Sequence, residues 1–231
     1  MKMRIATLSL LTILCLALGT TALAQGQIYN DGPTLGTTNA FFIDGVGGPF
    51  GQSISDGFFP TTSGSATDVS FAEWVLSGTT PTGVSYGIDT VNFGSALGGG
   101  VAGNFTTSLL CTNGAPYNGG LCAGGFGYDL YQSHFTFADI QMNVGTQYWL
   151  TLTGATDSGG TGFNGWDLNS GPATCLFEVG GIVPGGGLGC GAGGESFTIS
   201  SGGTTPEPSS ILLFGSGILG LAGVLRRKLT R

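Results

Sequence analysis

The residues of this chain that could do hydrolytic chemistry are few. His134 is the only histidine, so a mechanism that needs an imidazole base must use it. It stands in "YQSHFTF", next to Ser133 and close to Asp139. Adjacent residues of a strand point to opposite faces of a sheet, and no nucleophile-elbow sequence is present. We therefore expect His134 to be an ordinary strand residue and the protein not to be an enzyme. A secreted hydrolase whose triad is assembled from distant residues is the alternative that stays open.

A second segment combines aromatic rings with amide and carboxylate groups. Its candidate ligand-binding residues are Phe163, Asn164, Trp166, Asp167 and Asn169. Aromatic faces stack against sugars, and amides and carboxylates hydrogen-bond to hydroxyl groups, so the segment fits a neutral glycan. The competing interpretation is that Trp166 covers one end of a hydrophobic core.

The stretch "DLNSGPATCLFE", residues 167–178, has a carboxylate first, an amide third and a glutamate twelfth, as a calcium-binding EF-hand loop does. Gly171 stands at the fifth position and Pro172 at the sixth, where that loop needs a ligand and a glycine. An EF-hand is therefore not expected, and we predict no cofactor and no metal site. Calcium held in another loop geometry stays open, because nothing basic in the body offsets its carboxylates.

Charge is distributed very unevenly along the chain. All six Lys and Arg residues lie near the two ends, and none stands between Arg4 and Arg226. Twelve of the thirteen acidic residues fall between Asp31 and Glu195, so this body carries a formal charge of −12. Nucleic acid is excluded as a partner, since affinity for phosphates comes from Lys and Arg. Neutral glycans and divalent cations remain compatible with this charge.

The composition favours an all-β fold. The chain has 46 glycines, 15 phenylalanines and a positive mean hydropathy, which is typical of a foldable protein rich in turns. In "QYWLTLTG", Tyr148, Leu150 and Leu152 alternate with Trp149 and polar residues, as one face of a strand requires. The predicted strands are 53–59, 68–77, 84–93, 104–111, 128–142, 147–153, 175–179 and 196–200. This pattern predicts an antiparallel β-sandwich, of which a jelly roll is one form.

Four cysteines remain once Cys15 leaves with the predicted signal peptide. An even number in an exported protein favours disulfides, and the sequence-local pairing joins Cys111 to Cys122 and Cys175 to Cys190. The alternative is a metal site made only of cysteines. No two of these four residues have the close spacing that is usual for zinc ligands.

Both ends of the chain resemble topological signals. Residues 1–24 have a basic start, an apolar stretch and the small-residue site Ala22-Leu23-Ala24, which predicts a signal peptide cleaved after Ala24. Residues 209–225 are apolar or small, which predicts a single transmembrane helix at the short limit for a bilayer. The basic cluster directly after this segment stays cytoplasmic and leaves residues 25–203 outside. The cluster consists of Arg226, Arg227 and Lys228.

The order of Pro206-Glu207-Pro208, an apolar segment and an Arg-rich end resembles the PEP-CTERM sorting signal of Gram-negative bacteria. This resemblance covers residues 204–231. It implies an exosortase as processing partner, passage through the inner membrane with a transient anchor, and delivery to the cell surface or an exopolysaccharide matrix. A permanent inner-membrane anchor is the alternative. We predict a non-enzymatic structural or adhesive protein, and the alternative is a carbohydrate-binding module, with or without calcium, near Trp166.

Overall fold

The computed structural model describes residues 26–45, 47–160, 162–169, 175–179, 189–190 and 194–201. One compact unit spans Gly26–Gly202. The predicted signal peptide, the 209–225 segment and the sorting motif lie outside the described residues. Within the described part of the chain, no helix is long and apolar enough to cross a membrane.

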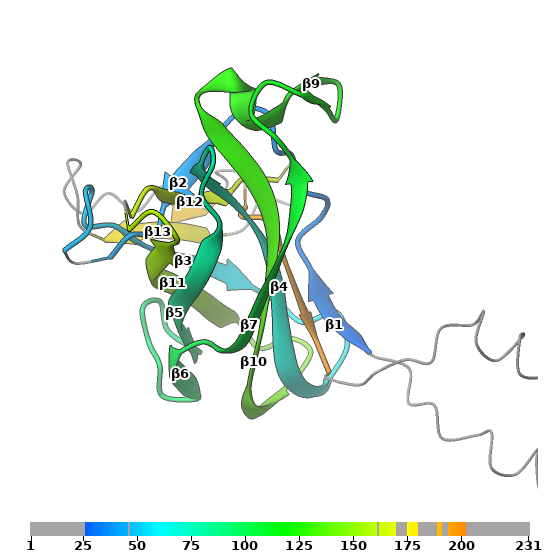
Figure 1. Ribbon diagram of the computed structural model, residues 1–231. Coiled ribbons are helices and arrows are strands. Elements are labelled where there is room, and N and C mark those ends of the chain that lie inside the picture. Colours follow the sequence, from blue (N-terminus) through cyan, green and yellow to red (C-terminus); the bar gives the residue numbers. More distant parts are fainter. Residues whose placement is uncertain are drawn as a thin grey trace, which may run out of the picture. The chain divides into compact units, whose positions relative to one another are not determined.

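Two large antiparallel sheets build this unit (Figure 1). The first has the order β1-β15-β4-β10-β7, with β12 pairing with β4 and β2 pairing with β12. Its strands are β1 (Gln27–Asn30), β2 (Ala40–Phe42), β4 (Gly64–Leu76), β7 (Gly103–Cys111), β10 (Tyr128–Met142), β12 (Asn164–Asp167) and β15 (Phe197–Ser200).

The second sheet has the order β14-β13-β3-β11-β5-β6. Its strands are β3 (Ser53–Phe58), β5 (Pro81–Asp89), β6 (Gly98–Val101), β11 (Tyr148–Asp157), β13 (Cys175–Val179) and β14 (Gly189–Cys190). A short hairpin of β8 (Pro116–Tyr117) and β9 (Gly120–Leu121) completes the fold. The described strands are thus all antiparallel, which confirms the predicted all-β class.

The main hydrophobic core lies between the two large sheets. Rings from opposite sheets meet there: Tyr29 of β1 lies 4.9 Å from Phe58 of β3, and Phe135 of β10 lies 5.0 Å from Tyr86 of β5, measured between centroids. The alternation expected in β11 is present, because Tyr148, Leu150 and Leu152 are all buried in this core. Packing of this kind is that of a β-sandwich.

A smaller core covers the outer face of β4 and β10 at one end of the sandwich. It contains Ala72, Trp74, Cys111, Cys122, Ala123 and Leu130. The disulfide between Cys111 and Cys122, which the sequence predicted, closes the loop that carries β8, β9 and the 3₁₀ helix η1 (Cys122–Gly125). We call residues 109–127 the tip.

Asp129 holds the base of the tip. Its carboxylate accepts hydrogen bonds from the Ser77 hydroxyl at 2.9 Å and from the backbone N–H of Asn113 at 2.7 Å. The same side chain also accepts one from the amide of Gly78 at 3.2 Å. These bonds, together with the disulfide, fix a loop whose glycines alone would leave it conformationally free.

Candidate functional site

Trp166 lies in the core, as the competing interpretation predicted, so the candidate sugar-stacking platform is not formed around it. Strand β12 is inserted between β2 and β4, and the Trp166 side chain has no exposed surface. Its ring packs against Phe71 at 6.2 Å and Phe197 at 5.6 Å, and its indole N–H donates to the carbonyl of Ser196 at 3.1 Å. An indole enclosed in this way has no free face to offer a ligand.

Asp167 is also buried, and it joins three parts of the chain. Its carboxylate accepts the indole N–H of Trp74 at 2.6 Å and the backbone N–H of Gly36 at 3.0 and 3.1 Å. A side chain at Gly36 would meet Leu130, which explains why glycine stands there. Burial raises the pKa of Asp167 to about 7, and these hydrogen bonds only partly oppose the shift. The contacts of the Asp167 carboxylate are therefore made inside the fold and stabilise it.

Asn164 and Asn169 complete this buried polar layer. The Asn169 amide donates to the carbonyl oxygen of Asp31, and to that of Glu195 at 3.0 Å. The Asn164 amide donates to the carboxylate of Glu73 at 3.5 Å. Neither amide is available to a ligand at the surface, since Asn164 is fully buried and Asn169 nearly so.

Three further carboxyl groups lie near Asp167, and no motif in the sequence marks them. Asp31, Asp56 and Glu195 are all fully buried. Burial raises the pKa of Asp31 to about 6. It also raises the pKa of Glu195 well above its usual range, and the negative charges of Asp56, Asp167 and Asp31 add to that shift. We call these four residues the acidic layer.

Two members of the acidic layer accept hydrogen bonds from neighbouring groups of the fold. Tyr29 donates its hydroxyl to Asp31 at 2.5 Å, and the backbone N–H of Glu195 donates to Asp56 at 2.7 Å. Among the described residues, no group of three His, Cys, Asp or Glu side chains is placed to hold a metal ion. Calcium held in another loop geometry stays an open alternative to the predicted absence of a metal site, and the side chain of Glu178 lies outside the described residues.

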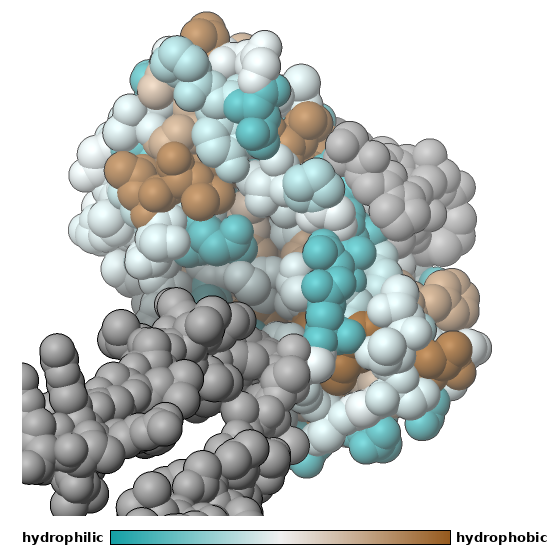
Figure 2. All heavy atoms as spheres, turned by 90° about the vertical axis from the view of Figure 1, so that its right-hand side faces the viewer, coloured by the Kyte–Doolittle hydropathy of each residue, from teal (hydrophilic) through white to brown (hydrophobic). Residues whose placement is uncertain are grey.

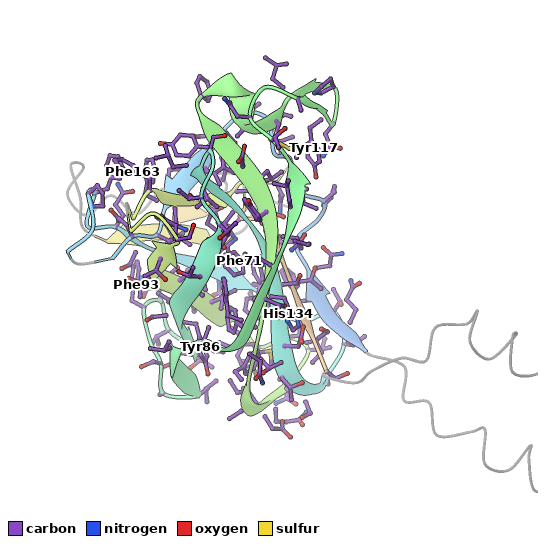
Figure 3. The ribbon with its side chains drawn as sticks, viewed as in Figure 1. Phe71, Tyr86, Phe93, Tyr117, His134 and Phe163 are labelled. Atoms are coloured by element: carbon purple, nitrogen blue, oxygen red, sulfur yellow. A yellow bond between two sulfur atoms is a disulfide. The ribbon has the colours of Figure 1, made fainter. Side chains whose placement is uncertain are left out.

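Phe163 directly precedes the buried Asn164, but its own side chain is half-buried; Figure 3 labels its position. Its ring lies edge-on to Phe50 at 5.7 Å, and Phe50 stacks on Phe42 at 3.9 Å. All three rings are half-buried. Pro49 and Gly162, the chain neighbours of Phe50 and Phe163, line a hollow of about 230 Å³.

Two carboxylates border that hollow, Asp44 and Asp157. Asp44 accepts backbone N–H groups from Phe50 at 2.5 Å and Gln52 at 2.8 Å, and Asp157 accepts those of Gly159 at 2.7 Å and Gly162 at 2.9 Å. The carboxylates thus hold the loops that shape the hollow. The three rings do not line the hollow themselves, but half-buried rings and a hollow bordered by carboxylates are the kinds of surface that a sugar contacts.

His134 lies on the open outer face of the first sheet (Figure 3). Its Nε2 pairs with the carboxylate of Asp68, and its Nδ1 lies 3.5 Å from the hydroxyl of Thr106. Ser133, next to it, points to the opposite face and donates its hydroxyl to the buried carboxylate of Glu73. Strand alternation thus separates Ser133 from His134, as the sequence predicted. Asp139 accepts a hydrogen bond from Ser65 instead of from His134.

The remaining cysteines lie partly outside the described residues. Cys175 of β13 is directly opposite Cys190 of β14 in the strand register. Their side chains are not among those described, so the second disulfide stays a prediction.

Comparison with known families gives one match. The model described as the PEP-CTERM protein-sorting motif matches residues 204–228. The matched range contains Pro206, Glu207, Pro208 and the basic cluster Arg226, Arg227 and Lys228. No curated protein and no solved structure matched the chain.

The chain therefore carries a PEP-CTERM sorting signal, as its sequence indicated. Such a motif marks an exported protein that undergoes a membrane-associated sorting step. It is a substrate signal for exosortase processing.

Proposed function

We propose that the protein is a non-enzymatic structural or adhesive component of the cell surface or the extracellular matrix. The sorting motif at residues 204–228 is the observation that carries this proposal, because it directs an all-β body out of the cell. After the sorting step an exosortase-type enzyme removes the membrane anchor, and the body reaches the surface or an exopolysaccharide matrix.

The contacts of the polar residues support a structural role. Asp167 and Asn169 connect strands and loops inside the sandwich, and His134 is held by Asp68 on an open sheet face. Their hydrogen-bonding capacity is used within the fold. A body stabilised in this way, with one disulfide described, suits a protein that must persist outside the cell.

The proposal is tested by locating the protein in its host with an antibody against the body. Wild type is expected in the surface or matrix fraction. Substitution of Pro206, Glu207 and Pro208 by alanine is expected to retain it in the inner membrane. Ser95→Ala with Leu97→Ala, at two exposed positions of the body outside the motif, serves as the control and should be sorted normally. Retention of wild type in the inner membrane would contradict the proposal.

A second candidate function is binding of a neutral glycan at Phe163 rather than at Trp166. The half-buried rings of Phe42, Phe50 and Phe163 favour it, and the chain neighbours of Phe50 and Phe163 line the hollow. Gel retardation by neutral polysaccharides should be lost in Phe163→Ala. It should be kept in Phe59→Ala, a control in which a ring that is 53% exposed is removed from another part of the body. Equal retardation of both variants and wild type would reject a site at Phe163.

A further inference from the structure

Strand β7 forms one end of the first sheet. Within the described residues it pairs with β10 alone, so its other side presents backbone N–H and C=O groups without a neighbouring strand. It has nine residues, whereas the other strands that end a sheet path are shorter: β1 and β6 have four each, β2 three and β14 two. Among its described strands the body therefore has one long free strand edge.

The residues of β7 do nothing to discourage pairing. Exposed edges in monomeric proteins are usually blunted by charged residues, by proline or by short length. The sequence "GNFTTSLLC" has no charge and no proline. Irregularities in its ladder with β10 lie toward the two ends, next to Leu130 and between His134 and Thr136 of β10, so the central residues Thr106–Leu109 are regularly paired.

Charge also favours this edge as the place where two copies meet. The body carries −12 in total, but residues 90–128 contain no charged residue. This uncharged stretch includes β6, β7 and the whole tip. Two copies repel one another over acidic parts of their surfaces, and that repulsion is smallest where β7 faces β7.

Apolar side chains are exposed near the same edge. Leu109 is 50% exposed, Leu121 52% and Phe126 69%, all within the tip. Figure 2 shows a brown apolar group at the top, where Figure 1 places the tip, and a larger one below it on the left. Pairing along β7 would cover apolar surface next to it.

We propose that two copies of this chain associate through antiparallel pairing of β7 with β7, which joins their first sheets into one continuous sheet. An antiparallel pair of identical strands has two-fold symmetry, so one uncharged edge is sufficient for both partners. A symmetry axis at Thr107 places Thr106 opposite the second copy's Ser108, and Phe105 opposite the second copy's Leu109. The first pair matches hydroxyl groups, and the second matches apolar groups on the core-facing side, where Phe105 packs.

The pairing is independent of where the protein is sorted, and it is tested on the full chain purified in detergent. Sedimentation equilibrium should give wild type a protein mass that approaches twice that of one chain as concentration rises. Ser108→Lys places a charge on each side of the axis and should give the mass of one chain over the same range. Gln27→Lys adds the same charge at the opposite edge of the same sheet and should behave as wild type.

A cysteine at the axis tests the register. Opposite residues of an antiparallel pair have Cα atoms about 4.5 to 5.5 Å apart, within reach of a disulfide. Thr107→Cys should therefore form a covalent dimer on mild oxidation, whereas Gln27→Cys should remain at the wild-type background. A wild type that stays monomeric would overturn the proposal. A dimer that survives Ser108→Lys would also overturn it, because the contact would then lie elsewhere, for example in residues 209–225.

Discussion

Glu195 donates its backbone N–H to the carboxylate of Asp56 at 2.7 Å, while its own carboxyl group is fully buried and accepts no hydrogen bond among the described residues. The side chains of Glu195 and Asp56 thus lie close together. No Lys or Arg can neutralise them, because the body has none. Burying a charge without a partner is costly, and protonation removes that cost.

Stability should therefore rise when the pH is lowered from 8 to 5. Burial raises the pKa of Asp31 to about 6, and those of Asp167 and Glu73 to about 7. The folded state then binds more protons than the unfolded state between about pH 4 and pH 7, so the free energy of unfolding falls as pH rises through that window. Asp31 alone contributes on the order of 3 kcal/mol over the whole window, of which about half is gained by pH 5. Urea unfolding at several pH values measures the effect.

A cation in the acidic layer would give the opposite sign. Its carboxylate ligands would have to be ionised, so acidification or a chelator would lower the unfolding midpoint. Unfolding curves with calcium and with EDTA at pH 7.5 separate the two cases. We expect them to coincide.

Glu195→Gln should stabilise the protein at pH 8 and have a smaller effect at pH 5. The amide has nearly the shape of the carboxyl group, carries no charge, and does not add to the repulsion from Asp56. Thermal unfolding at both pH values gives the comparison, and Asp139→Asn at an exposed position is the control. A lower Tm for Glu195→Gln at pH 8 would mean that the ionised carboxylate is needed.

Replacing Trp166 by alanine should destabilise the body by roughly 3 to 5 kcal/mol, because it leaves a cavity between Phe71 and Phe197. Phe126→Ala, at a ring that is 69% exposed, should change the unfolding free energy by less than about 0.5 kcal/mol. Denaturant titration distinguishes them. Comparable stability of both variants would place Trp166 outside the core.

Loss of the disulfide at the tip should be measurable in the same way. Cys111 and Cys122 close a loop with a sequence separation of 11, and the chain-entropy model assigns such a closure about 3 kcal/mol. Substituting both by serine should lower the unfolding free energy by about that amount. Reduction of wild type should reproduce at least this loss, and an unchanged midpoint in both experiments would contradict it.

Most of the sheet could be predicted from local pattern. Every one of the eight predicted segments overlaps a strand, and 128–142 and 175–179 match β10 and β13 at both ends. The segment 84–93 was extended too far at its end, because Asp89 accepts the amides of Thr90 and Ala96 and closes a turn there. Strand alternation is a local property of the chain, so a single sequence displays it.

The predictions failed where neighbours distant in sequence decide the structure. Asn164–Asp167 contains Gly, Asn and Asp and resembles a loop, yet β4 and β2 make it the buried strand β12. The acidic layer joins Asp31, Asp56 and Glu195 from three remote segments, and no local motif marks them. The imbalance of twelve acids and no bases is visible in the sequence, but it does not say which carboxyl groups are buried together.

The measurement that tests the central claim most directly is the intact mass of the protein recovered from the surface and the medium of its host. We predict a mass that lacks residues 1–24 and the segment that follows Pro206-Glu207-Pro208, and that is lower by about two mass units for each disulfide. Recovery of the protein only from the inner membrane, with its C-terminal segment intact, would contradict export and processing through the sorting signal.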